Sequence, residues 1–126
     1  MTQRLRRTAA VAGIALALTV GAATPAFATV HNESDTQTRW VTHNATQTVV
    51  KMESRKNGDH QAVYVQVVKG PLEVQARAKC ARRDGGTRWY QSTIAVGVGQ
   101  GASHYDCDNN GTYNFELVGM GVDFLD

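Results

Sequence analysis

The sequence predicts an all-β domain, a small antiparallel β-sandwich of roughly six or seven strands with one disulfide. β-Branched and aromatic residues recur in short runs from Trp40 onward, and turn residues separate these runs. No long window after residue 28 has a convincing helical period. The chain holds two cysteines, Cys80 and Cys107, which suits a single cross-link. A small β-barrel is the alternative architecture.

Residues 1–28 have the pattern of a signal peptide that is removed on export. Arginines near the start precede an apolar run from Ala9 to Val20, and the segment closes on Ala26-Phe27-Ala28. A membrane-spanning helix would need roughly 20 apolar residues, which is more than this run contains. We therefore expect cleavage after Ala28 and a secreted, extracellular mature protein with no membrane span.

After the leader, the chain is expected to divide into a short lead-in and one domain. Residues 29–39 are polar and without periodicity, so we expect a flexible N-terminal segment there. Residues 40–126 are long enough for a single β domain with one core. The chain has 13 basic and 11 acidic residues, and three of the basic residues lie in the leader. The expected mature protein therefore has a net charge of −1. Since phosphate binding usually requires a clearly basic domain, no nucleic-acid partner is expected.

Turn residues and apolar alternation mark the strands in order along the domain. Asn57-Gly58 is a strong hairpin signal. Ala62–Val68 carries valines on one face, with Tyr64 and Val68 on the other, which is typical of a central strand. From Leu72 to Arg83 apolar and polar residues alternate, so one face should be buried and the other solvated. Further turn signals follow at Lys69-Gly70-Pro71, Asp84-Gly85-Gly86, Gly99-Gln100-Gly101 and Asp108-Asn109-Asn110-Gly111.

The C-terminal segment changes the phase of its alternation. Apolar residues occupy the odd positions of Tyr113–Leu117 and the even positions of Val118–Phe124. Such a change requires a bulge, or a strand that passes from one sheet to another. Gly119 and Gly121 favour a bend at this point, so we expect one there.

The two cysteines limit the topology. Cys80 lies on the alternating strand, and Cys107 lies two predicted strands later. The outer two of three neighbouring strands in one flat sheet would be about 9.6 Å apart. A disulfide spans Cα separations of only about 4.4 to 6.8 Å. A Cys80–Cys107 bond therefore favours two sheets packed face to face, with Cys80 pointing inward.

One loop resembles half of a calcium-binding motif. Asp106, Asp108 and Asn110 place oxygen side chains at alternate positions ahead of Gly111. The second half is missing, because the twelfth position, which usually holds a bidentate acid, is Leu117. A turn whose Asp and Asn side chains accept backbone hydrogen bonds accounts for the same residues. We therefore expect no cofactor, with calcium at Asp106, Asp108 and Asn110 as the alternative.

Histidines supply an alternative function, a small secreted hydrolase. They have no short metal-ligand spacing, but a histidine that the fold pairs with a carboxylate would act as a general acid or base. The candidates are His43, His60 and His104 with Asp59, Asp106 or Glu116. The sequence contains no Gly-x-Ser-x-Gly nucleophile motif that would strengthen this interpretation. A secreted antimicrobial toxin is a further alternative.

Aromatic and basic residues form the favoured functional surface. Trp89 and Tyr90 are adjacent, so on a strand they point to opposite faces and one of them should be exposed. An exposed ring binds sugars or anchors a protein partner, and basic neighbours dock acidic groups. We therefore expect a secreted, non-enzymatic binding domain that recognises an extracellular protein or polysaccharide. Its candidate residues are Trp40, Trp89, Tyr90, Arg77, Lys79, Arg83 and Arg88.

Overall fold

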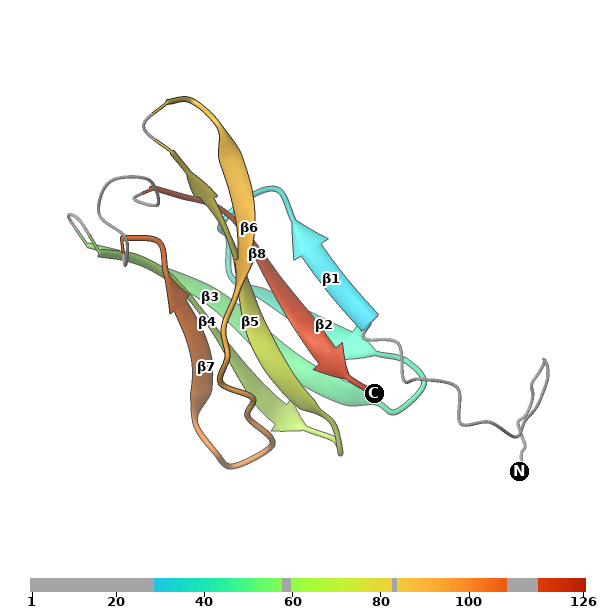
Figure 1. The fold of residues 1–126 in the computed structure, drawn as a ribbon. Helices are drawn as coiled ribbons and strands as arrows, with labels where there is room; N and C mark the ends of the chain where they lie inside the picture. The colour runs from blue at the N-terminus through green and yellow to red at the C-terminus, as the bar shows by residue number, and fades with distance from the viewer. Residues whose placement is uncertain (1–28, 58–59, 83, 109–115) are drawn as a thin grey trace, which may run out of the picture.

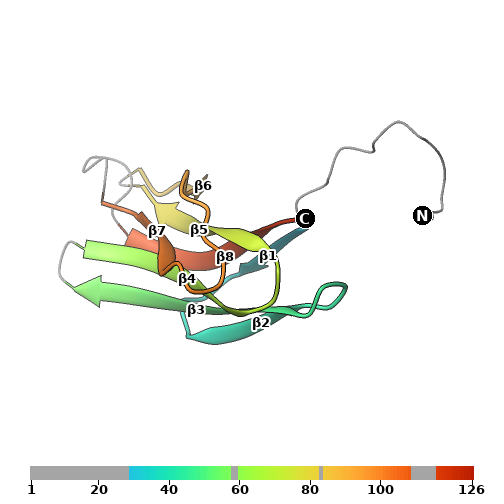
Figure 2. The ribbon, with the colours of Figure 1, turned by 90° about the horizontal axis from the view of Figure 1, so that it is seen from below.

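The computed structural model describes residues 29–57, 60–82, 84–108 and 116–126. These residues form the predicted β-sandwich of two antiparallel sheets, each with four strands, and no helix among them is long and apolar enough to cross a membrane (Figure 1). The front sheet has the order β1-β8-β5-β6 and the back sheet the order β2-β3-β4-β7. Figure 2 shows the two layers, with β5 and β8 in one and β2 and β3 in the other. The strands are β1 (Thr29–Glu33), β2 (Arg39–His43), β3 (Thr48–Asn57), β4 (His60–Lys69), β5 (Glu73–Ala81), β6 (Thr87–Gln91), β7 (Ala102–Asp106) and β8 (Glu116–Leu125).

The described residues hold eight strands, more than the predicted six or seven. The polar segment 29–39, which was expected to be flexible, belongs in part to the sandwich. Thr29–Glu33 forms β1 and pairs with β8 over its whole length, while β2 begins at Arg39. Backbone hydrogen bonds need no apolar side chains, so a polar segment can pair with the edge of a sheet whose core is already built. The front sheet therefore includes residues N-terminal to the predicted boundary at Trp40.

The core lies between the sheets and consists of alternate strand residues. β5 follows the predicted pattern, because its inward residues from Val74 to Cys80 are fully buried while its polar residues face out. β4 is central in the back sheet, as expected, and buries its three odd-numbered valines. Its other face, with Tyr64 and Val68, is partly exposed. No further layer covers this face among the described strands, so the sandwich has two solvated outer faces.

A β-bulge in β8 accounts for the predicted change of phase. The pairing of β8 with β5 shifts by one residue between Lys79 and Cys80, which leaves Val118 as an extra residue. Leu117 and Met120, on either side of the bulge, consequently both point into the core and are fully buried. The part of this prediction that precedes β8 lies outside the described residues.

The chain crosses from the back sheet to the front sheet at the predicted turn after β4. Gly70 has a φ of 102°, in the region that favours glycine. A Cβ at this position would overlap the backbone of Thr48, which is fully buried. Glycine at position 70 therefore permits both the turn and its close approach to the start of β3.

The Cys80–Cys107 disulfide joins the two sheets, as expected from the topology. Cys80 is on β5 in the front sheet, and Cys107 directly follows β7 in the back sheet. Their Cα atoms are 5.6 Å apart, and both residues are fully buried. The sequence separation of 27 residues makes the bond a long-range constraint on the unfolded chain.

The last residue of the chain connects the two sheets at the other end. The Asp126 carboxylate accepts hydrogen bonds from the Thr29 hydroxyl at 2.7 Å and from His43 Nε2 at 2.9 Å. Thr29 belongs to β1 in the front sheet, and His43 ends β2 in the back sheet. Burial opposes ionisation of Asp126, but the hydrogen bonds from Thr29 and His43 outweigh it and lower the pKa of the carboxyl below its usual 3.8.

We expect the double variant Cys80→Ala/Cys107→Ala to lose roughly 3 to 4 kcal/mol of unfolding free energy, because the unfolded chain is no longer cross-linked. Equilibrium unfolding in urea of both proteins under non-reducing conditions measures this loss. An unchanged unfolding free energy would show that the bond does not constrain the unfolded chain.

We expect Asp126→Asn to destabilise the protein by roughly 1 to 2 kcal/mol at neutral pH, since an amide accepts the two hydrogen bonds more weakly. Because the folded pKa is lowered, the ionised carboxylate contributes stability above its usual pKa of 3.8 and loses that contribution as the pH falls through the folded value. The difference in urea midpoint between wild type and variant should therefore be smaller at about pH 2.5 than at neutral pH. An equal difference at both pH values would contradict this account.

Candidate functional site

The outer face of the front sheet carries three of the predicted binding residues. The inward direction of Cys80 and Ala78 forces the intervening residues of β5 outward, so Arg77 and Lys79 face solvent. Lys79 pairs with Trp89 across the β5–β6 hairpin, which puts the indole on the same face. The Arg77 guanidinium carbon lies 5.4 Å from the centroid of the Trp89 ring, within the range of a cation–π contact.

A network of planar polar side chains extends from this ring across the sheet. Arg77 donates hydrogen bonds to the Gln91 Oε1 at 2.9 Å and to the Asn32 Oδ1 at 3.1 Å. The Gln91 amide donates to the Gln75 Oε1 at 2.7 Å and to the Asp123 Oδ2 at 2.9 Å. The network therefore connects all four strands of the front sheet, from β6 through β5 and β8 to β1.

Two glycines of β8 form the floor between these side chains. A Cβ on Gly119 would lie 3.1 Å from the Cβ of Lys79, and one on Gly121 would lie 3.3 Å from the Cβ of Arg77. Both hypothetical atoms would also come within 2.9 Å of backbone oxygens of β1. The missing side chains thus let β1 approach β8 closely.

Asp123 has an unsatisfied oxygen at this face. The residue is only 5% exposed, although it lies on the outward side of β8. Its Oδ2 accepts the hydrogen bond from Gln91, whereas its Oδ1 is buried and has no hydrogen-bond partner among the described residues. A buried carboxylate oxygen without a hydrogen-bond donor is energetically costly.

The structure places Trp40 and Tyr90 away from this face. Trp40 is 61% exposed, but it lies on the outer face of the back sheet, where Lys51 Nζ is 5.8 Å from its ring. It borders an open hollow of about 480 Å³ between the edges of the two sheets. Tyr90 points to the inner side of β6 and stacks on Tyr105 with ring centroids 5.3 Å apart. Burial raises the pKa of Tyr105, and the neighbouring Tyr90 adds to this effect.

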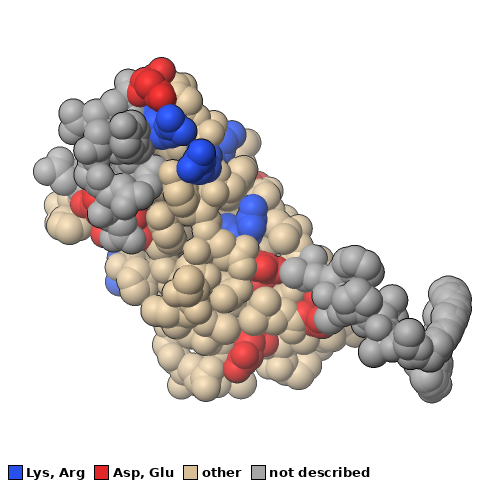
Figure 3. Space-filling model, viewed as in Figure 1, with Lys and Arg blue, Asp and Glu red and all other residues tan. Residues whose placement is uncertain are grey.

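Trp89 and Tyr90 therefore point to opposite faces, as expected, but both are half-buried. Arg88 lies at the end of the hairpin, with its guanidinium carbon 6.0 Å from the Tyr90 ring. Arg83 lies outside the described residues. Figure 3 looks onto the front sheet and shows the Lys and Arg side chains gathered toward the end where β5 turns into β6.

Sequence reasoning missed the polar members of the network. The alternation along β5 predicts that Gln75 lies on the solvated face. This alternation is the one sequence pattern that points to a member of the network. Asn32 was assigned to a flexible segment, and Gln91 and Asp123 come next to Arg77 only through the pairing of β5 with β6 and β8. Their proximity depends on strand order, which local patterns do not encode.

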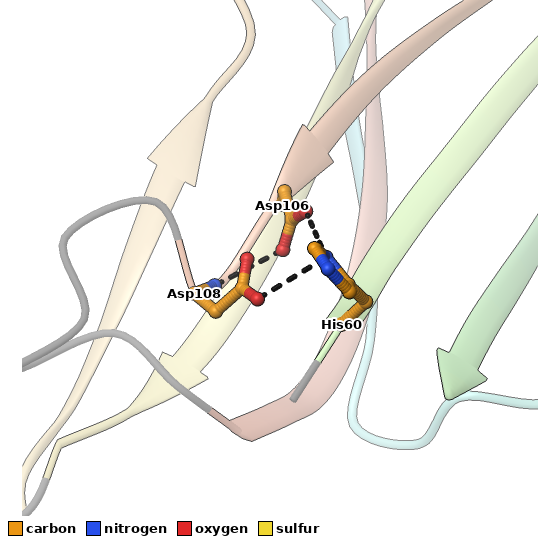
Figure 4. Close-up of side chains that lie close together, drawn as sticks. All are labelled: His60, Asp106 and Asp108. Carbon is orange, nitrogen blue, oxygen red and sulfur yellow. Dashed lines mark hydrogen bonds and ion pairs between the residues drawn. The ribbon is translucent and has the colours of Figure 1, made fainter. Parts of the chain in front are cut away.

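A second cluster of polar side chains lies at the end of the back sheet. His60 Nδ1 is 3.4 Å from the Asp106 Oδ2 and 3.2 Å from the Asp108 Oδ2, and Figure 4 shows the imidazole facing both carboxylates. The structure therefore brings together two residues of the predicted calcium loop and adds a histidine that the motif did not include. Asn110 lies outside the described residues.

The two carboxyl groups of this cluster differ in their acidity. Burial opposes ionisation of Asp106, but hydrogen bonds from Asp108 and His60 outweigh it and lower the pKa of Asp106. The hydrogen bond to Asp106, together with burial and the neighbouring negative charge, raises the pKa of Asp108. Two carboxylates this close resist simultaneous ionisation, so Asp108 takes up a proton before Asp106 as the pH falls.

The histidines of the hydrolase alternative have different surroundings. His60 contacts Asp106, one of the carboxylates considered from the sequence. His43 is paired with Asp126 through one ring nitrogen and with the Thr46 hydroxyl through the other, and its side chain is 9% exposed. Both ring nitrogens of His43 are thus engaged in hydrogen bonds within the protein. His104 stacks on Tyr64 on the outer face of the back sheet, with ring centroids 5.2 Å apart.

Comparisons with known proteins give no relative from which a site could be transferred. No protein-family model matches the chain, and neither the curated proteins nor the solved structures include a significant match. The candidate sites therefore depend on the geometry of this chain alone.

Proposed function

We propose that the protein is a secreted, non-enzymatic binding module for an extracellular polysaccharide. The ligand binds on the outer face of the front sheet, along Trp89, Arg77 and Gln91. The observation that carries this proposal is the position of an indole ring beside a connected set of guanidinium, amide and carboxylate groups on one solvated sheet face.

The chemistry of this face suits a sugar. A pyranose ring has an apolar face of C–H groups that packs on an aromatic ring, and a rim of hydroxyls that both donate and accept hydrogen bonds. The amides of Gln75 and Gln91 offer both roles, and Arg77 donates.

A polysaccharide fits the face better than a protein does. Protein interfaces usually centre on several clustered large apolar or aromatic side chains. The exposed apolar residues of the front sheet, Val30 and Leu125, are at the far end from Trp89, because they lie in register with Gln75 and Glu73. Around Trp89 the described neighbours are polar, which favours a hydroxyl-rich ligand.

Secretion is supported by two independent features of the chain. The first 28 residues have the pattern of a cleaved leader. The described residues contain no free cysteine, and their one disulfide is buried. Disulfides persist mainly in oxidising compartments outside the cytosol.

We expect Trp89→Ala to reduce binding to the ligand polysaccharide at least about tenfold, which corresponds to the loss of an aromatic anchor. Trp40→Ala is the matched control, since it removes the same side chain from the opposite face. Co-sedimentation of purified protein with insoluble cellulose, chitin, peptidoglycan and starch measures the bound fraction, and circular dichroism checks the fold of each variant.

The proposal requires that one of these polymers binds wild type and Trp40→Ala but not Trp89→Ala. Loss of binding in Trp40→Ala with Trp89→Ala unaffected would move the site to the back sheet and overturn the proposal. Absence of binding to any polymer would overturn the polysaccharide assignment. Capture of a protein from culture supernatant through Trp89 would do the same.

A further inference from the structure

The His60, Asp106 and Asp108 side chains converge on one point outside the proposed binding face. One ligand atom from each residue lies within 4.8 Å of the other two. Ligand atoms about 2.1 Å from a tetrahedral zinc ion are about 3.4 Å apart. The two distances from His60 Nδ1 to the carboxylate oxygens, 3.4 and 3.2 Å, are close to this value. The donors thus nearly have the spacing of a metal site without any ion present.

Covalent and hydrogen-bonded constraints hold the backbone of this cluster. Asp106 and Asp108 flank Cys107, whose disulfide anchors the segment to β5. The Cys107 N–H donates a hydrogen bond to the Gln61 carbonyl at 2.8 Å, and Gln61 is the residue after His60. The backbones that carry all three side chains are therefore linked to one another independently of any ligand, so a metal would bind to a largely preformed site.

We propose that His60, Asp106 and Asp108 bind a divalent transition metal, with Zn²⁺ as the matching ion. One imidazole nitrogen and two carboxylate oxygens are a donor set that zinc uses, and three protein ligands leave a position for water or a ligand. Calcium fits less well, because it takes six to eight oxygen ligands and does not favour imidazole. The site differs from the predicted calcium loop in its metal and in its third ligand.

This site is independent of the polysaccharide proposal. It lies at the end of the back sheet, where β4 begins and β7 ends, whereas Trp89 lies on the outer face of the front sheet. His60 is 75% exposed, so an ion has direct access from solvent. The hydrogen bond from Cys107 to Gln61 already links β4 to the segment after β7, and a bound ion would add a second link between them.

Isothermal titration of Zn²⁺ into protein that has been stripped with EDTA tests the proposal. We expect one ion per chain, and a binding constant reduced at least about tenfold in His60→Ala and in Asp108→Asn. His104→Ala is the matched control, since it removes an exposed histidine of the same sheet whose ring stacks on Tyr64 and is not part of the cluster, and it should leave the binding constant unchanged. Zn²⁺ should also raise the melting temperature of wild type and of His104→Ala, but not that of His60→Ala.

The second variant keeps the test decisive if His60→Ala does not fold, because Asp108→Asn preserves the size of the side chain. No saturable binding of Zn²⁺ to wild type would overturn the proposal. Zn²⁺ binding that persists in both His60→Ala and Asp108→Asn would do so as well, since the ion would then occupy another histidine. Tighter binding of Ca²⁺ than of Zn²⁺ in a parallel titration would contradict the choice of metal.

Discussion

Cys80 and Cys107 link the facing sheets at the end of the sandwich where both candidate sites are built. Because Cys80 must point into the core to reach its partner, the residues on either side of it along β5 must point outward. This orientation places Lys79 and Arg77 on the outer face beside Trp89. The same bond fixes the backbone between Asp106 and Asp108, whose side chains face His60. One cross-link therefore determines the direction of side chains in two sheets.

The polar network of the front sheet depends in turn on the irregular strand β8. The bulge at Val118 allows Leu117 and Met120 both to enter the core, and the two glycines that follow leave space for β1 and for the stem of Arg77. A regular β8 with side chains at these positions would separate β1 from the sheet and remove Asn32 from the network. The bulge and the two glycines together thus support the polar network of the front sheet.

The two proposed sites differ in how they would respond to a ligand. On the front sheet the hydrogen bonds among Arg77, Gln91 and Asp123 already order these side chains. The protein would therefore lose little side-chain entropy when a sugar binds, but the sugar would have to replace some of these internal hydrogen bonds. In the His60 cluster the carboxylates of Asp106 and Asp108 lie close together, and a cation bound between them would offset the repulsion of their charges. The two proposals therefore assign a hydroxyl-rich ligand to the first site and a positive ion to the second.

The sequence by itself determined the features that arise from local alternation and from covalent limits. It predicted the sandwich, the alternating strand β5, the phase change at β8 and a disulfide between sheets, because each follows from side-chain period or from the reach of one bond. Only the tertiary structure decided that Thr29–Glu33 forms a strand, that Trp40 and Trp89 lie on opposite outer faces, and that His60 joins Asp106 and Asp108. These outcomes depend on which strands become neighbours. Strand order is set by the total burial of the core and by long-range pairing, which no short segment of the sequence contains.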